Sequence, residues 1–441
     1  MSIEIVLKKR SNRLCLQTHE WANRLTQSVF ARQVGTTVLA RGAFLALSLA
    51  TAAIIARWLG PAGKGQLAMI FMVPSMFGMF LSFGLGPANV YYVGSSRLPV
   101  YQLSANAVAF SILGTAIGFL AGLVILLSDI LPMLLPGVSS TYLILGMVAL
   151  PLGLLSGNLN TILQGLRRIY TLNILSILGS LLSVAFMAAF LIWLQFGILG
   201  AIVATLSVQA VMLLVAGLCV KREGARFSPK WNPQIVRPTI KYGLKSYVGN
   251  LLQFFNYRVD LFIVNFFLGP ASVGIYGVAV ALAELLWQVP NAASFVIFPK
   301  SANSTQETMN RFTPRVFWLI LAITIAGAVV LALFGKLVIR IVFSSAFLDA
   351  YVPLLILLPG ATLLGAGKVL TNDIAGRGYP HYNSITAGVS LVATVALDLL
   401  LIPDMGIVGA ALASTASYAL SFFASVLFYL TVSRRATLSV T

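Results

Sequence analysis

The chain has 441 residues, of which 59% are hydrophobic and only 9% are charged. About a quarter of the residues of a soluble domain are charged, so this composition excludes an ordinary soluble enzyme and indicates a membrane protein. The formal net charge of +18 would suit a nucleic-acid-binding protein. The basic residues lie between apolar runs, however, which favours a role in membrane orientation and predicts no nucleic-acid partner.

Apolar runs recur along the whole chain, and each is long enough to cross a hydrocarbon core of about 30 Å. Lipid offers the backbone no hydrogen-bond partner, so the runs must be helices. We therefore predict an all-α integral membrane protein with twelve transmembrane helices. Their expected ranges are 37–58, 67–93, 104–127, 141–163, 170–193, 198–220, 242–267, 272–298, 315–334, 351–375, 383–402 and 407–431.

Basic residues are distributed unevenly among the loops between these helices. If the N-terminus is cytoplasmic, 21 of the 29 Lys and Arg residues fall on the cytoplasmic side and four on the opposite side. This is the positive-inside pattern, so both termini are expected in the cytoplasm. Cys15 and Cys219 imply no disulfide. The basic first 35 residues lack the apolar run of a signal peptide and fit either an interfacial helix or a loosely ordered tail.

One sequence pattern occurs twice, 209 residues apart. "WLGPAGKG" at 58–65 matches "FLGPASVG" at 267–274, and "FGILGAIVAT" at 196–205 matches "MGIVGAALAS" at 405–414. Arg168 and Tyr170 match Arg377 and Tyr379 in the same register. Because each half would contain six helices, the repeats are parallel and predict two six-helix lobes around a central cavity.

This duplication divides the chain into five parts. They are a basic cytoplasmic N-terminal segment (1–35), an N-terminal lobe (36–220), a basic cytoplasmic linker (221–241), a C-terminal lobe (242–431) and a cytoplasmic tail (432–441).

Several segments resemble the polysaccharide and O-antigen flippases of the multidrug/oligosaccharidyl-lipid/polysaccharide exporter superfamily. The similar segments are "ARWLGPAGKGQLAM" (56–69), "FGLGPANVYYV" (83–93), "YRVDLFIVNFFLGPASVGIYGVAVALAELL" (257–286) and "LLLIPDMGIVGAALAST" (399–415). The resemblance covers essentially the whole chain. Its motifs are mainly structural glycines and prolines, so they are more specific for the fold than for the cargo.

The resemblance implies a transporter that moves a polyprenyl-pyrophosphate-linked oligosaccharide, such as an O-antigen repeat unit, from the cytoplasmic to the periplasmic leaflet by alternating access. It also implies a multi-pass protein of the bacterial inner membrane that acts in lipopolysaccharide or polysaccharide biosynthesis as a monomer. Membrane lipids, a glycan polymerase and a chain-length regulator are the candidate partners.

Eight ionisable side chains fall inside the expected helices, where a charge costs at least about 2.5–3.5 kcal/mol unless it faces protein or water. They are Arg41, Lys245, Arg258, Asp260, Glu284, Lys368, Asp373 and Asp398. Asp373 and Asp398 lie near helix ends, where we expect solvation. The basic residues Arg41, Lys245, Arg258 and Lys368 are the candidate binding surface for the pyrophosphate, although Arg41 and Lys245 could also extend to the headgroups.

The seventh helix carries a polar face. Asn250, Gln253, Asn256, Tyr257 and Asp260 recur at three- and four-residue steps, which places them on one side of a helix. They would line the cavity or, alternatively, hydrogen-bond between packed helices.

Asp260 and Glu284 are the candidate ion-coupling residues. Burial at mid-membrane favours the neutral form of a carboxyl group, which suits proton coupling at Glu284. The alternative is that Glu284 forms an ion pair with Arg258 or Lys368. Arg258 is two positions from Asp260 on the same helix, so these two side chains are not expected to pair.

The chain lacks a GxxxxGK[ST] loop, a metal-ligand cluster and a nucleophile–base constellation. We therefore expect no cofactor, no metal and no enzymatic activity. Two alternatives to the flippase remain. A cation-coupled multidrug exporter of the same fold would need a more acidic or apolar cavity, and a membrane glycan polymerase would need a large periplasmic loop.

Overall fold

The computed structural model describes residues 3–128, 131–228 and 232–438, and within these ranges the side chains of 3–41, 131, 245, 246, 295 and 435–438 are not described. All regular secondary structure in the described residues is helical. The elements are α1 (Ile3–Leu81), α2 (Leu85–Gly94), α3 (Val100–Leu127), α4 (Leu131–Leu134), α5 (Ser140–Met147), α6 (Ala149–Gly165), α7 (Ile169–Met187), η1 (Ala188–Trp193), α8 (Gly197–Arg222), α9 (Pro233–Asn256), α10 (Val259–Glu284), η2 (Leu285–Trp287), α11 (Gln288–Asn303), α12 (Gln306–Val338), η3 (Ile339–Phe343), η4 (Ser345–Ala350), α13 (Tyr351–Gly376) and α14 (Pro380–Leu438).

Nine helical segments of the described residues are long and apolar enough to cross a membrane. Three of them, 42–81, 247–303 and 380–434, have 40, 57 and 55 residues, about twice the length that one crossing needs. Each contains one glycine with non-helical dihedral angles: Gly60, Gly269 or Gly406. The chain is therefore an all-helical multi-pass membrane protein with nine to twelve spanning helices, depending on whether a bent segment counts once or twice.

The bends share a backbone conformation that glycine adopts without steric cost. Gly60 and Gly269 have φ of 66° and 77°, and Gly197 and Gly406 have φ of 58° and 61°. Both pairs are separated by the 209 residues of the sequence repeat. We call the end of the bundle that contains these four glycines the turn end.

The two copies of the repeated turn touch each other reciprocally at the turn end. A Cβ atom on Gly65 would lie 1.7 Å from the carbonyl oxygen of Pro270, and one on Gly274 would lie 2.0 Å from that of Pro61. Pro61 and Gly65 correspond to Pro270 and Gly274 in the repeat. The absence of side chains at both glycines thus lets the backbones of α1 and α10 come into direct contact.

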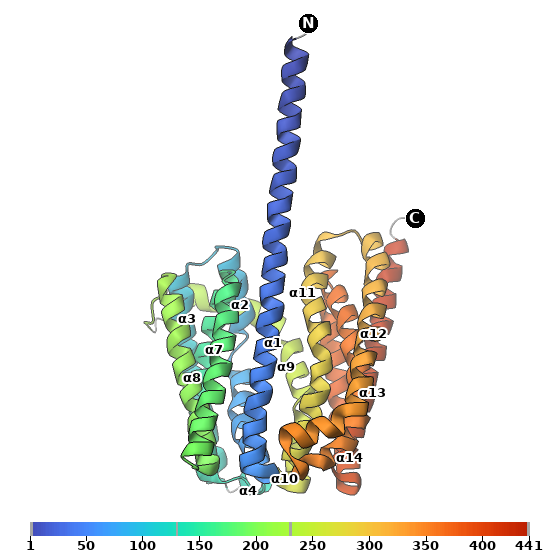
Figure 1. The fold of residues 1–441 in the computed structure, drawn as a ribbon. Helices are drawn as coiled ribbons and strands as arrows, with labels where there is room; N and C mark the ends of the chain where they lie inside the picture. The colour runs from blue at the N-terminus through green and yellow to red at the C-terminus, as the bar shows by residue number, and fades with distance from the viewer. Residues whose placement is uncertain (1–2, 129–130, 229–231, 439–441) are drawn as a thin grey trace.

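Figure 1 shows how the remaining helices are arranged around this contact. Helices α3, α7 and α8 gather on one side of α1 and α11 to α14 on the other, and the N-terminal part of α1 projects beyond the bundle. Helix α9 contacts both groups. The Ser82 hydroxyl donates to the Tyr247 oxygen at 2.8 Å within α9, and Thr394 of α14 donates to Asn256 at 2.9 Å at the C-terminal end of α9.

The segment predicted as a linker is partly helical, because α9 begins at Pro233 rather than at residue 242. The Asn232 side chain caps this helix by accepting a hydrogen bond from the Gln234 backbone N–H at 3.0 Å. Proline at the first helical position supports the same start, since its missing N–H would have no partner there.

A buried ion pair and an exposed one, both with four-residue spacing, yield a stability prediction. Arg377 and Asp373 pair at 2.7 Å with side chains that are 2% and 0% exposed, whereas Arg311 and Glu307 pair at 2.8 Å with 75% and 78% exposed. Asp373→Ala should lower the free energy of unfolding by about 3–5 kcal/mol, because it leaves a buried guanidinium unpaired. Thermal unfolding of the purified protein in detergent measures the loss.

Glu307→Ala is the matched control and should change stability by less than about 1 kcal/mol. Equal losses in the two variants would contradict the importance of the buried pair.

Candidate functional site

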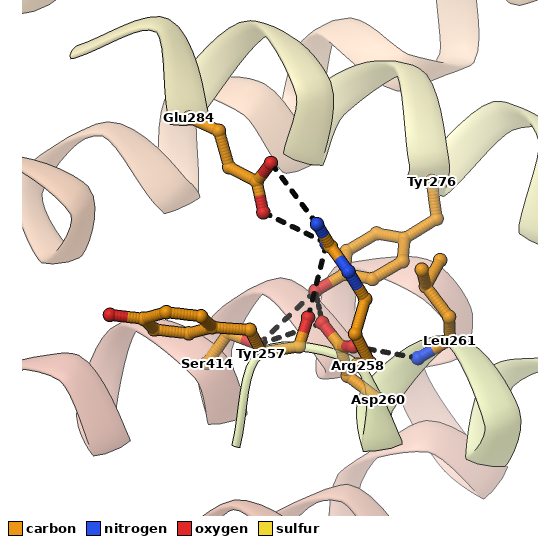
Figure 2. A network of polar contacts seen from close by, with 7 residues as sticks. All are labelled: Tyr257, Arg258, Asp260, Leu261, Tyr276, Glu284 and Ser414. Carbon is orange, nitrogen blue, oxygen red and sulfur yellow. Dashed lines mark hydrogen bonds and ion pairs between the residues drawn. The ribbon is translucent and has the colours of Figure 1, made fainter. Parts of the chain in front are cut away.

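Arg258 lies at a break between two helices inside the membrane-spanning region. Helix α9 ends at Asn256 and α10 begins at Val259. The break lets the Arg258 guanidinium reach the last residue of α10, where it pairs with Glu284 through Nη1–Oε1 at 2.8 Å and Nη2–Oε2 at 3.4 Å. Figure 2 shows this two-pronged contact. The sequence left two alternatives for Glu284, a proton-coupling group or an ion pair with Arg258 or Lys368. In the structure Glu284 forms the ion pair with Arg258.

The Arg258–Glu284 pair is not sealed from its surroundings. The two side chains are 36% and 26% exposed, which is unusual for charges within a membrane-spanning bundle unless they face a hydrated space. A bidentate guanidinium–carboxylate pair has the geometry with which arginine also binds phosphate. An anionic ligand that reached Arg258 would compete directly with Glu284.

Lys368 of α13 is the second described cation in this region. Its ammonium group donates to Asn291 at 2.9 Å and lies 4.4 Å from the ring centroid of Trp287 and 5.7 Å from that of Tyr257. Among the described residues it forms no ion pair. Neutral amide and aromatic partners hold the ammonium group without cancelling its charge.

Asp260 has a different environment although it is two residues from Arg258. Its side chain is 1% exposed. It accepts hydrogen bonds from the Tyr276 hydroxyl at 2.9 Å, the Ser414 hydroxyl at 3.3 Å and the Leu261 backbone N–H at 2.7 Å. As the sequence predicts, Arg258 and Asp260 form no ion pair in the described part of the chain. Figure 2 shows the two side chains directed to separate partners.

The expected solvation of Asp373 and Asp398 is wrong, because both side chains are fully buried. Asp373 pairs with Arg377. Neither carboxyl oxygen of Asp398 has a hydrogen-bond partner among the described residues. Asp398 and Asp260 are thus two buried carboxyl groups on α14 and α10. Sequence reasoning missed this acid because its position near a helix end suggested water, whereas neighbouring helices cover it.

The polar face expected on the seventh helix does not act as one surface. Asn250 is exposed, Gln253 and Tyr257 are half-buried, and Asn256 is 1% exposed and bonded to Thr394. Asn256 therefore lies in packing between α9 and α14 and does not line an open cavity. The helix break at 257–258 interrupts the periodicity from which a single face was predicted.

Arg41 and Lys245, the other two candidate cations, have side chains outside the described residues. Within the described residues, no group of three or more His, Cys, Asp and Glu side chains could hold a metal ion. The structure adds Tyr276, Asn291 and Trp287 to the site. Asn291 lies seven residues after Glu284, a spacing that places the two on one side of a continuous helix, and this is the sequence signal that could have found it.

Comparison with known proteins gives relatives among membrane proteins of archaea. An uncharacterized membrane protein of Methanocaldococcus jannaschii is 24% identical over 225 residues, 49% of this chain and 44% of that protein. The probable low-salt glycan biosynthesis flippase Agl15 of Haloferax volcanii is 27% identical over 194 residues, 42% of this chain and 40% of that protein. The chain thus spans less than half the length of either relative.

Two solved structures show the same fold. The lipid II flippase MurJ in an inward closed conformation has a TM-score of 0.69 and 17% identity, covering 91% of this chain and 90% of that chain. An inward-facing multidrug resistance MATE family transporter has a TM-score of 0.67 and 17% identity, covering 89% of this chain and 94% of that chain.

A sequence model of the polysaccharide biosynthesis protein family matches residues 30–305. Because this match covers more than half of the chain, the chain belongs to the polysaccharide biosynthesis protein family.

Proposed function

We propose that the protein is a transporter, not an enzyme, that flips a polyprenyl-pyrophosphate-linked oligosaccharide across the cytoplasmic membrane by alternating access. Twelve helices would form two parallel six-helix lobes around a central cavity, with both termini cytoplasmic. In this orientation the turn end faces outward, and the reciprocal contact of Gly65 and Gly274 closes the outer side. The bacterial inner membrane and O-antigen biosynthesis remain the proposed setting, although both curated relatives are archaeal.

One observation carries this proposal: a partly exposed arginine–carboxylate pair lies inside a membrane-spanning bundle, and the same half of the chain holds an ammonium group, Lys368, that has no acidic partner among the described residues. A pyrophosphate has the charge and oxygen geometry to displace Glu284 from Arg258. Lys368 would supply a second positive charge as a point contact. The pair with Glu284 would keep Arg258 compensated while no cargo is bound.

Energy input is proposed to come through Asp260 and Asp398. Buried carboxyl groups without an ion-pair partner among the described residues favour the uptake of a proton. Glu284 is a weaker candidate for this role than the sequence suggested, because its carboxylate already has a cationic partner.

The same buried acids support the second candidate function, a cation-coupled multidrug exporter, and the fold is equally compatible with it. A drug exporter would not require the phosphate-binding geometry of Arg258. The two functions therefore differ in whether anionic pyrophosphate lipids or organic cations compete for transport.

Reconstituted vesicles test the proposed function. Fluorescent polyprenyl-pyrophosphate-linked oligosaccharide is placed in both leaflets, and its accessibility to a membrane-impermeant quencher is followed with and without protein. We expect the protected fraction to become accessible only with protein. Export of an organic cation without any movement of the glycolipid would reject the flippase and favour the exporter.

Lys368→Gln should reduce the flipping rate by about tenfold, since one charge-assisted contact contributes on the order of 1.5 kcal/mol. Glutamine can still hydrogen-bond to Asn291, so the packing is conserved. Lys336→Gln is the control, because Lys336 is exposed near the end of α12. An equal effect of the two substitutions on the rate would argue against a specific role for Lys368.

Glycan polymerases and chain-length regulators are proposed partners, and a monomer is the proposed active form.

A further inference from the structure

The first half of the chain contains a cavity separate from the charged site. Its volume is about 510 Å³, within the range of about 300–1,000 Å³ that small-molecule sites occupy. Side chains of α1, α6, α7 and α8 line it. Phe44 and Ser176 of this lining are exposed, so the cavity is open to the surroundings.

The lining is neutral and rich in hydroxyl groups, and no charged residue occurs among its described side chains. Small hydroxyl-bearing residues are common where membrane helices pack closely, but here they surround an open volume instead of a closed contact. The hydroxyl-bearing residues are Ser48, Thr51, Ser156, Ser176, Ser180 and Ser183.

Many of these polar groups are available to a ligand. Thr51, Ser176 and Ser180 donate to carbonyl oxygens of their own helices at 2.9–3.1 Å, so their oxygen lone pairs can still accept hydrogen bonds. The buried Oδ1 atom of Asn160, also in the lining, has no partner among the described residues. An unsatisfied buried acceptor is costly unless a ligand or water supplies a donor.

The second half differs at the corresponding positions of the repeat. At the 209-residue offset, Thr51 corresponds to the buried Asp260 and Ser48 to Tyr257. Tyr257 there packs against Trp287 with ring centroids 4.9 Å apart. The second half therefore fills this position with an aromatic ring and a carboxylate, whereas the first half leaves a neutral space.

We infer that this cavity, the neutral cavity of the first half, is a binding subsite for an uncharged sugar ring. A sugar presents many hydroxyl donors to the acceptors of the lining and does not need a charged partner. The inference rests on the proposed function: the charged site in the second half would hold the pyrophosphate, and the neutral cavity would hold part of the glycan.

Paired ligands test the subsite with the full-length protein in lipid nanodiscs. Dissociation constants are measured for polyprenyl pyrophosphate and for the same lipid carrying a neutral disaccharide. The wild type should bind the disaccharide lipid at least about tenfold more tightly, because several hydrogen bonds are added. Ser180→Leu fills the cavity and should abolish this difference while the affinity for the bare lipid is unchanged.

Two further variants test whether a loss of sugar preference in Ser180→Leu results from a folding defect. Thr51→Val keeps the side-chain volume, removes one hydroxyl and should reduce the sugar preference by about threefold to tenfold. Thr431→Leu is the matched control, since Thr431 makes the same bond to its own helix but is exposed on α14. Equal binding of the two lipids by the wild type, or an undiminished preference in Ser180→Leu, would overturn the subsite.

A separate measurement distinguishes failure of the subsite from failure of the flippase function. Ser183→Cys, in a background in which Cys15 and Cys219 are replaced by serine, is labelled with a maleimide in the presence of free disaccharide. Protection at this position, and not in a Thr431→Cys control, supports the subsite even if neither pyrophosphate lipid binds. Binding of both lipids without protection or sugar preference would leave the flippase intact and reject the subsite.

Discussion

Replacing Arg258 with glutamine is expected to reduce glycolipid flipping by about 100-fold, because a pyrophosphate would lose two charge-assisted hydrogen bonds of about 1.5–3 kcal/mol each, of which the amide replaces only part. The Arg258 guanidinium already forms a two-pronged contact with a carboxylate, and unlike the fully buried Arg377–Asp373 pair this contact is partly exposed. The rate is measured in reconstituted vesicles, and a thermal-unfolding curve checks that the variant is folded.

Glu284→Gln should have the opposite effect on binding. Its carboxylate occupies the guanidinium at 2.8 Å, so its removal frees Arg258, and the affinity for polyprenyl pyrophosphate should rise by up to about tenfold. Equal loss of binding in both variants would mean that the ion pair only stabilises the fold and that the pyrophosphate binds elsewhere.

Adding a methyl group where the two repeated turns touch should reduce the flipping rate about as much as replacing Arg258 does. In Gly65→Ala the new Cβ would lie 1.7 Å from the Pro270 carbonyl oxygen, so α1 and α10 would have to separate. If this contact closes the outer side of the cavity, flipping should fall by about 100-fold, since alternating access needs both conformations. The distance between spin labels at Ser139 and Asp404, both exposed, should increase.

Two variants control this experiment. Gly274→Ala makes the symmetric clash and should reproduce the defect, whereas Gly217→Ala has its nearest neighbour atom at 3.9 Å and should be tolerated. An unchanged label distance in Gly65→Ala together with normal flipping would exclude the turn contact as a gate.

The candidate site was predictable only in part. Arg258 and Glu284 stand out from sequence because charges are rare in membrane helices, and their pairing was one of two alternatives for Glu284. The solvation assigned to Asp398 failed because distance from a helix end does not reveal which neighbouring helices cover it. Asn256 follows the second of the two alternatives for the polar face, because it accepts a hydrogen bond from Thr394 of the neighbouring helix α14.

The sequence by itself determined the all-helical membrane class and the repeated motifs whose glycines, Gly60, Gly269 and Gly406, the structure places at bends. Hydrophobic run length and the conformational freedom of glycine are local properties, so they can be derived from neighbouring residues alone. Only the tertiary structure decided which polar groups meet. Arg258 and Glu284 are 26 residues apart, and Asp260 and Ser414 are 154 apart. Such contacts depend on how helices pack, because several neighbours of similar polarity could satisfy each group equally well.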